Sequence, residues 1–223
     1  MKIEMHLHTK SGSPCGETPE ELVPSLCRQA GYGAVAVTNH YNKWIAEDFY
    51  AGLYGKKVDP VECFLHGYRE VKRAAEDTGL TVLLGMEIAC RAAGYQEFML
   101  FGFDETFLRA YPRLYELDQR ELFSLCNEKG LFMYQTHPFR DGIVTGDGRF
   151  MHGVEVYNGH KGHQNHNESA LCMADEYGLR QLSGSDCHTP GSAGTGGIVA
   201  ENVYTEQDLV RCLQTAQPAL IKN

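Results

Sequence analysis

The stretch Lys2-Ile3-Glu4-Met5-His6-Leu7-His8-Thr9 decides how this sequence is interpreted. Apolar and polar residues alternate along it, which predicts a β-strand, and residues two positions apart on a strand point the same way. His6 and His8 therefore face one spot. If this is the first strand of a parallel barrel, its C-terminal end lies at the face where such barrels carry their chemistry. Because histidine is the commonest metal ligand, the pair suggests a metal site, although an isolated His-x-His more often combines a core residue with a strand cap.

Length and charge limit the classes of protein that fit. The chain has 223 residues, which can bury a sizeable core and predict a single domain, 1–223. Its formal net charge is −9 and it has no basic run, so we expect no stable nucleic-acid partner and no attraction to an anionic membrane. The first residues lack the apolar core of a signal peptide, and apolar runs such as 98–103 are too short to cross a bilayer.

The eight cysteines do not form a disulfide pattern. They stand at positions 15, 27, 63, 90, 126, 172, 187 and 212, without a Cys-x-x-Cys pair. Most lie inside apolar stretches, where a free cysteine behaves as a small hydrophobic residue. This usage predicts free thiols in a reducing compartment, and hence a cytoplasmic protein.

Predicted strands and helices alternate along the chain. After the first strand we expect strands at 34–38, 80–88, 131–136, 153–158 and 181–185, and helices at 18–30, 59–78, 105–129, 167–177 and 206–215. Thr18, Asp59 and Thr205 stand where a helix N-cap is expected. Residues 96–103 predict a further strand, which could pair with 80–88 as a hairpin, and another predicted strand ends at 204. The alternation favours parallel βα units, so the predicted fold class is α/β.

Side chains that can bind metals fall at or near the ends of these separate strands. They are His6, His8, His40, Glu87, His137, Asp186 and His188. In a closed barrel the strand ends ring one mouth, so these groups would converge there. Because burying so many ionisable groups without partners is costly, we expect at least two metal ions, with Glu87 as a candidate bridge. Nitrogen and oxygen ligands favour Zn, Mn or Fe over a thiolate site.

Six motifs, in order along the whole chain, resemble those of the PHP family, the polymerase and histidinol phosphatase domains. They are His6-Leu7-His8-Thr9, Val37-Thr38-Asn39-His40, Gly85-Met86-Glu87, Thr136-His137-Pro138-Phe139, Val154-Glu155-Val156-Tyr157-Asn158 and Gly184-Ser185-Asp186-Cys187-His188. The resemblance implies a distorted (β/α)7 barrel, similar to a TIM barrel. It also implies two to three divalent metal ions at a site that hydrolyses phosphoesters.

The resemblance also implies how the ligands are shared. One metal would be held by His6, His8, Glu87 and Asp186, a second by Glu87 and His137, and a third by His40 and His188.

The sequence departs from the family pattern in three places. Asn39 stands where an Asp is usual. No His occupies the strand 96–100. Only Cys15, or less favourably Glu17, could supply a further ligand after the His-x-His loop.

The chemistry and the substrate contacts follow as expectations. Adjacent cations lower the pKa of a bound water toward neutrality, giving a hydroxide that Asp186 could orient at a site bridged by Glu87. Arg140, Lys10 and His163 are candidate contacts for the substrate, and Asn39 and Glu155 are expected to orient ligands. The aromatic stretch 41–54 could form a lid, although such side chains more often belong to the core.

The predicted function is a metal-dependent phosphoesterase that acts on a small phosphorylated metabolite or a nucleotide. Two alternatives stay open. Related metal barrels also hydrolyse amides and lactones, so an amidohydrolase-like reaction on a non-phosphate bond is one. A non-catalytic metal-binding domain is the other, because of the departures at Asn39 and in the strand 96–100.

Overall fold

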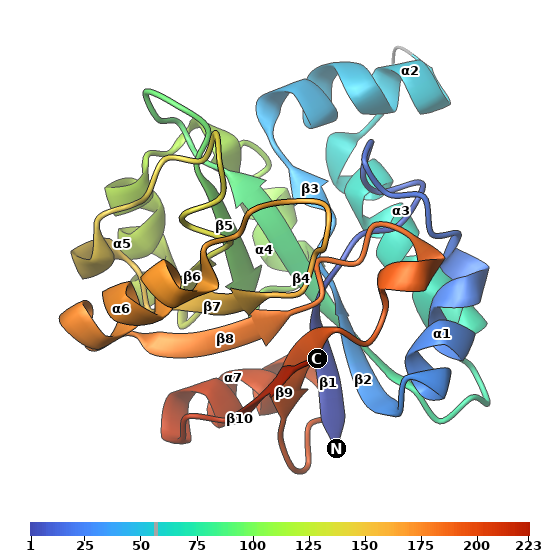
Figure 1. Ribbon diagram of the computed structural model, residues 1–223. Coiled ribbons are helices and arrows are strands. Elements are labelled where there is room, and N and C mark those ends of the chain that lie inside the picture. The colour runs from blue at the N-terminus through green and yellow to red at the C-terminus, as the bar shows by residue number, and fades with distance from the viewer. Residues whose placement is uncertain (56–57) are drawn as a thin grey trace.

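The computed structural model describes residues 1–55 and 58–223 and shows a mixed sheet that curls almost into a barrel (Figure 1). The strand order is β10-β9-β1-β2-β4-β5-β6-β7-β8, and the short β3 pairs with β4. The strands are β1 (Lys2–Leu7), β2 (Tyr32–Val37), β3 (His40–Tyr41), β4 (Thr81–Ala89), β5 (Glu97–Phe101), β6 (Phe132–Gln135), β7 (Gly153–Asn158), β8 (Arg180–Gly184), β9 (Gly196–Val199) and β10 (Ala219–Lys222). The predicted distorted α/β barrel is confirmed.

The barrel closes through the segment that follows β8. Leu7 and Cys187 form a parallel bridge. The amide of His8 donates to the carbonyl of Cys187, and the amide of Cys187 donates to the carbonyl of His6, each at 3.0 Å. Because Cys187 follows Asp186, this closure sets the Asp186 carboxylate beside the His-x-His pair of β1.

Strand β5 runs against both of its neighbours. It pairs antiparallel with β4 and with β6, so the predicted hairpin partner is confirmed. A short connection can join only antiparallel strands, because a parallel pair needs a long crossover. As a result the first residue of β5, Glu97, lies at the same end of the sheet as the last residues of β4.

Helices cover the outside of the sheet (Figure 1). They are α1 (Val23–Gln29), α2 (Tyr50–Tyr54), α3 (Pro60–Ala74), α4 (Glu105–Ala110), α5 (Gln119–Lys129), α6 (Asn167–Tyr177) and α7 (Glu206–Thr215). The predicted caps at Asp59 and Thr205 are confirmed, since their side chains accept from the amides of Val61 and Asp208. All eight cysteines are free thiols, as predicted. No helix among the described residues is long and apolar enough to cross a membrane.

Two helix predictions are wrong. The stretch 105–129 is not one helix, because α4 ends before Pro112 and α5 begins after a capping box at Asp118. Proline cannot donate the backbone hydrogen bond that a continuing helix needs. Thr18 does not cap the first helix. Its hydroxyl donates to the carbonyl of His188, and a 3-10 turn, η1 (Glu20–Leu22), precedes α1.

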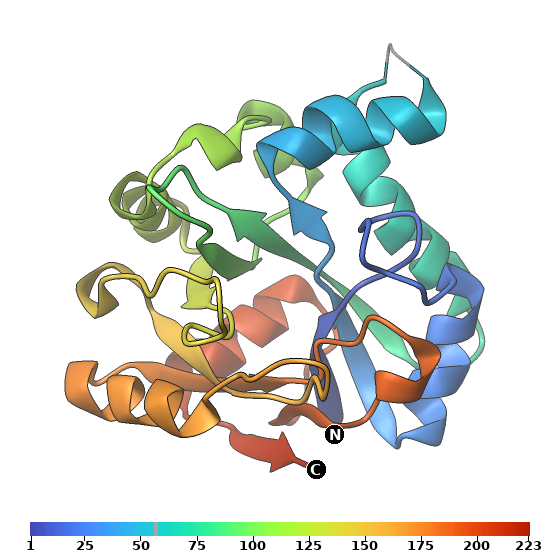
Figure 2. The ribbon, with the colours of Figure 1, turned by 45° about the horizontal axis from the view of Figure 1, so that its top comes forward.

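The segments that follow β1, β2, β4, β6, β7 and β8 lie at one end of the sheet, which we call the rim and which Figure 2 turns toward the viewer. The aromatic stretch 41–54 is part of this rim. It forms β3, a π-helical turn η2 (Ile45–Phe49) and α2. Tyr41 and Tyr50 are fully buried there, whereas Trp44 is exposed. Half of the stretch is therefore exposed, including Trp44 and Tyr54, and only part of it belongs to the core.

Candidate metal centre

The two histidines of the first strand point their inner nitrogens at one place. Nδ1 of His6 lies 2.9 Å from Oε1 of Glu155, and Nδ1 of His8 lies 3.1 Å from the hydroxyl of Ser13. A partner on one ring nitrogen fixes the ring and leaves the other nitrogen for a ligand. The two Nε2 atoms lie 3.1 Å apart. Both imidazoles are fully buried, so the pair forms a preorganised two-nitrogen site.

Glu87, on β4, lies at the centre of the cluster. Its Oε1 is 3.4 Å from Nε2 of His6 and 3.1 Å from Nε2 of His137. Its Oε2 is 3.3 Å from Nε2 of His8 and 3.0 Å from Nδ1 of His40. The two oxygens of one carboxylate thus face two different pairs of imidazoles, which is the arrangement that a bridging ligand needs.

Asp186 supplies a second carboxylate beside the His-x-His pair. Its Oδ1 lies 3.4 Å from Nε2 of each of three histidines: His6, His8 and His188. Its Oδ2 accepts from the guanidinium of Arg140 and from the amide of Asn158. All seven side chains expected from the sequence are therefore brought together, although they span residues 6–188.

The backbone is strained at two of these residues. His137 has φ of 27° and Asp186 has φ of 50°, in the left-handed region that favours glycine. Such conformations cost about 1–3 kcal/mol and persist only where the surroundings hold them. Here the amide of His137 donates to Glu155, and Asp186 precedes the bridge at Cys187. Strain at both positions is typical of residues that are held for function.

Several nitrogen and oxygen atoms of the cluster that could bind a metal have no hydrogen-bond partner. These atoms test whether the residues present fit a metal ion. Among the described residues, both oxygens of Glu87, Oδ1 of Asp186 and Nδ1 of His40 are buried and make no hydrogen bond. Buried polar groups are nearly always satisfied, so several unsatisfied groups at one spot need an explanation. Sets of donor atoms lie within 4.8 Å of one another, including those of His6, His8 and Glu87. Divalent cations fit this donor set.

The electrostatics of the cluster agree with such a role. Burial alone would raise the pKa of Glu87, but the charges of His6 and His40 outweigh it and hold that pKa well below its usual value. Burial would lower the pKa of His6, but Asp186, Glu155 and Glu87 raise it well above its usual value. Carboxylate charge here is balanced by protons on imidazoles, and a divalent cation can take the place of those protons.

Asn39 and Glu155 hold the residues around the cluster. The Asn39 side-chain oxygen accepts from the Thr9 amide at 2.8 Å and from the Ser13 hydroxyl at 3.2 Å, and Ser13 in turn contacts His8. Glu155 contacts His6 and accepts from the His137 amide. Both side chains therefore contact residues of the cluster or of the loop beside it, and the side-chain oxygen of Asn39 is the acceptor in its contacts.

Sequence reasoning missed Glu97. Met99 lies directly across from Glu87. Glu97 stands two positions before Met99, so it lies on the same face of β5. Its Oε1 is buried, has no hydrogen-bond partner and lies 3.3 Å from Nδ1 of His40. A carboxylate thus stands near the position where the family pattern suggested a histidine. The available signal was the hairpin itself, which turns the start of β5 toward the mouth.

Cys15 joins the cluster from the loop after β1. Its sulfur and donor nitrogens of His8, His40 and His188 lie within 4.8 Å of one another. Burial would raise the pKa of the Cys15 thiol, but a hydrogen bond to His40 and the charge of His8 lower it. Cys187 does not take part, because its thiol is buried and donates to the carbonyl of Thr189.

A cavity of about 380 Å³ opens onto the cluster. Arg140 and His163 line it, together with several of the ligand-type side chains. Lys10, the other candidate substrate contact, is exposed and is not among the described residues that line this cavity. The structure therefore brings Arg140 and His163, but not Lys10, to the space above the cluster.

The fold is shared with several solved structures, one of them described as PHP-like. A two-domain protein from Bacteroides vulgatus, described as containing a predicted PHP-like metal-dependent phosphoesterase, matches with a TM-score of 0.71 and 20% identity. The match covers all of this chain and 65% of that one, so the chain spans just under two thirds of this relative. PsfC from Pseudomonas syringae matches with a TM-score of 0.68 and 15% identity, over 100% of this chain and 91% of that one.

A third structure extends the likeness to another class. An amidohydrolase from Chromobacterium violaceum matches with a TM-score of 0.61 and 14% identity, over 100% of this chain and 98% of that one. A family model described as PHP-associated matches residues 164–218. No curated protein matches the sequence. The chain thus has a PHP-like barrel fold, and the resemblance that its motifs indicate is confirmed.

Proposed function

We propose that this protein is a metal-dependent phosphoesterase that hydrolyses a small phosphorylated metabolite or a nucleotide. The observation that carries the proposal is the convergence of unpaired donor atoms on Glu87, Asp186 and His40 beneath a cavity that also holds Arg140. A phosphoester needs cations to neutralise its oxygens and a donor to orient it; the clustered side chains could hold such cations, and Arg140 is the donor. The description of the Bacteroides vulgatus structure supports the same class of reaction.

We propose two to three divalent ions, of Zn, Mn or Fe. One would be held by His6, His8, Glu87 and Asp186. A second would be held by Glu87 and His137 with Glu97, and a third by His40 and His188 with Cys15. When bound, such ions lower the pKa of a coordinated water and stabilise charge on the phosphoryl group.

The chain's own residues position the reactants. Oδ1 of Asp186 has no hydrogen-bond partner and can accept a hydrogen bond from the attacking water. The guanidinium of Arg140 donates through Nη2 to Asp186, is fixed by Asn165 at 2.9 Å and Asn158 at 3.3 Å, and can donate to a phosphoryl oxygen through Nη1. His163 lies at the cavity wall, where it can donate to the substrate. These contacts orient the phosphoryl group before bond cleavage.

The proposal is tested by metal analysis paired with turnover. Protein purified without a metal-affinity tag is expected to carry two to three equivalents of Zn, Mn or Fe and to hydrolyse phosphomonoesters, with Mn²⁺ or Zn²⁺ restoring metal lost to a chelator. Less than one equivalent, unrestored by added metal and without turnover, would contradict the metal centre. Bound metal without turnover on any ester would favour a non-catalytic metal-binding domain.

Removing the guanidinium should weaken the binding of phosphate. We expect Arg140→Ala to raise KM for a phosphomonoester about 10- to 100-fold, because a hydrogen bond to a charged group contributes about 1.5–3 kcal/mol. Steady-state kinetics and inhibition by inorganic phosphate measure this effect. Lys10→Ala is the matched control, because it removes a positive charge outside the cavity.

The same pair of variants separates the proposal from hydrolysis of a non-phosphate bond, which the fold likeness to an amidohydrolase leaves open. An enzyme for amides or lactones would turn over such substrates, and inorganic phosphate would not compete with them. If Arg140→Ala leaves both KM and phosphate inhibition unchanged, the phosphate-binding role assigned to Arg140 is wrong.

A further inference from the structure

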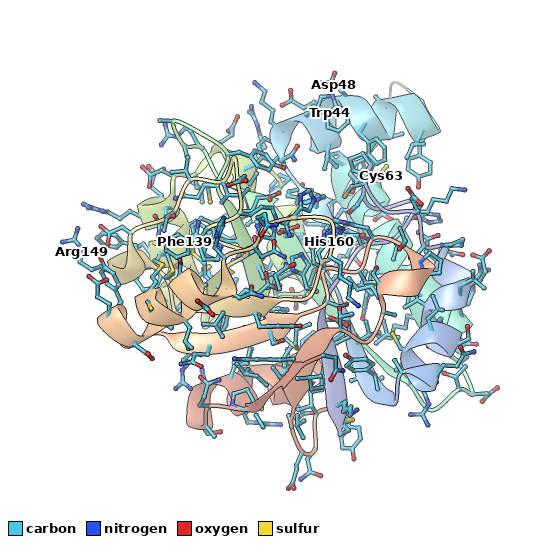
Figure 3. All side chains as sticks on the ribbon, viewed as in Figure 1. Trp44, Asp48, Cys63, Phe139, Arg149 and His160 are labelled. Atoms are coloured by element: carbon cyan, nitrogen blue, oxygen red, sulfur yellow. The ribbon has the colours of Figure 1, made fainter. Side chains whose placement is uncertain are left out.

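A second, larger hollow adjoins the metal centre. Its volume is about 870 Å³. It lies between the segment that joins β3 to η2 and the loop that joins β4 to β5. We call it the aromatic groove; its lining residues include Trp44, Tyr95 and Tyr115. Trp44 is 53% exposed and Tyr95 is 47% exposed. Two large aromatic rings therefore face solvent at the aromatic groove, which the sequence had not predicted. Figure 3 shows Trp44 at the top of the molecule, beyond the strand ends.

Tyr95 connects the aromatic groove to the metal centre. It lines both the groove and the cavity above the cluster. Burial, followed by the charge of Glu97, raises the pKa of Tyr95. Its carbonyl accepts from the amide of Val144 at 2.7 Å, which ties it to the loop that carries Arg140. The two hollows are thus separated by one tyrosine whose backbone is held in place.

The groove is suited to an uncharged ring rather than to a second anion. Part of the lining consists of small side chains, those of Ala89, Cys90 and Ala92. The guanidinium of Arg91 already pairs with Glu121 at 2.9 Å and with Asp118 at 3.6 Å, so its charge is offset.

The other charged residues in the lining are Lys43 and Glu116, one of each sign, and Glu116 pairs with Arg113. Aromatic faces with little net charge favour a planar apolar group, through stacking. The groove therefore differs in character from the cluster of carboxylates and imidazoles beside it.

We propose that the substrate is a phosphate monoester with a planar aromatic or heteroaromatic ring on a short spacer. The ring would lie in the aromatic groove against Trp44 and Tyr95 while the phosphate lies at the metal centre, as the base and phosphate of a nucleoside monophosphate could. Only the placement of the phosphate in this inference rests on the proposed function. The placement of the ring rests on the side chains that line the aromatic groove.

Trp44 makes the ring site directly measurable, because it is the only tryptophan in the chain. Its fluorescence, excited where adenine does not absorb, is expected to fall when the purified protein is titrated with adenosine or adenosine 5′-monophosphate. Ribose 5-phosphate and inorganic phosphate, which lack the ring, should leave it unchanged at the same concentration. Calorimetric titration with adenosine gives a second measure of binding that does not depend on the fluorophore.

Kinetics of matched variants complete the test. Trp44→Ala is expected to raise KM about tenfold for adenosine 5′-monophosphate and to leave that for ribose 5-phosphate unchanged, since stacking on an aromatic side chain contributes about 1–3 kcal/mol. Trp44→Phe should restore most of the loss. Tyr204→Ala, which removes an exposed ring 66% accessible elsewhere on the surface, is the control.

The outcomes separate this inference from the proposed function. Adenosine binding without any ester turnover would support the ring site and contradict the phosphoesterase. Turnover of phosphomonoesters with no adenosine binding by either measurement, and with equal kinetics for Trp44→Ala on both substrates, would overturn the ring site alone.

Discussion

Replacing Glu87 with glutamine is expected to strip the protein of most of its bound metal and to lower kcat/KM by about a thousandfold or more. Glutamine has the same size, so the change removes charge rather than packing. The two oxygens of Glu87 face His6 and His137 on one side and His8 and His40 on the other. Cations contribute several kcal/mol of transition-state stabilisation, and each 1.36 kcal/mol corresponds to a tenfold rate change.

Elemental analysis and kinetics on the same preparation measure both parts of this prediction. Glu21→Gln makes the same chemical change at an exposed position of η1 and should alter neither. A Glu87→Gln protein that keeps its full metal content and its turnover would show that Glu87 is neither a bridge nor a ligand. Circular dichroism confirms that the variant is folded before either comparison is made.

The second large effect is expected at Asp186. An Asp186→Asn protein should lose about two to four orders of magnitude in kcat, the range typical of a positioned acid–base group, while it still binds metal through its other ligands. The asparagine keeps an oxygen where Oδ1 stands but not the charge. It also suits the backbone, because φ of 50° lies in the region that asparagine tolerates best after glycine.

That backbone fit makes Asp186→Asn a cleaner test than Asp186→Ala, in which the strained conformation would be harder to hold. Metal content, melting temperature and kcat are measured together. Loss of kcat with metal retained supports the role of Asp186 in orienting the attacking water. Full turnover with metal retained would contradict that role. Loss of metal together with loss of kcat would show that Asp186 is chiefly a metal ligand.

The sequence by itself determined the strand ends and the chemistry placed there. His6 and His8 lie on one face of β1 because the strand period is two, and His40, Glu87, His137, Asp186 and His188 follow or end other strands. The caps at Asp59 and Thr205 were also readable, because a cap depends on residues only two or three positions apart. These features arise from local patterns, so a single sequence reveals them.

Other parts of the fold and site were decided by tertiary structure. Glu97 reaches His40 only because β5 runs antiparallel between β4 and β6, which turns its first residue toward the mouth. The break of the stretch 105–129 into α4 and α5, by contrast, had a local signal in Pro112, which periodicity alone did not reveal. Strand direction and crossover geometry depend on pairing between distant segments, which no local window contains.

The rim shows the same division most clearly. The sequence shows the stretch 41–54 as a run of aromatic residues without a clear period. It does not show which of these rings are buried. Packing buried Tyr41 and Tyr50 and left Trp44 facing a groove that Tyr95, from a loop some fifty residues away in sequence, shares with the metal centre. Residue type set the chemistry that is available, and the closure of the barrel decided which side chains meet, because a shared cavity forms only when distant strand ends come together.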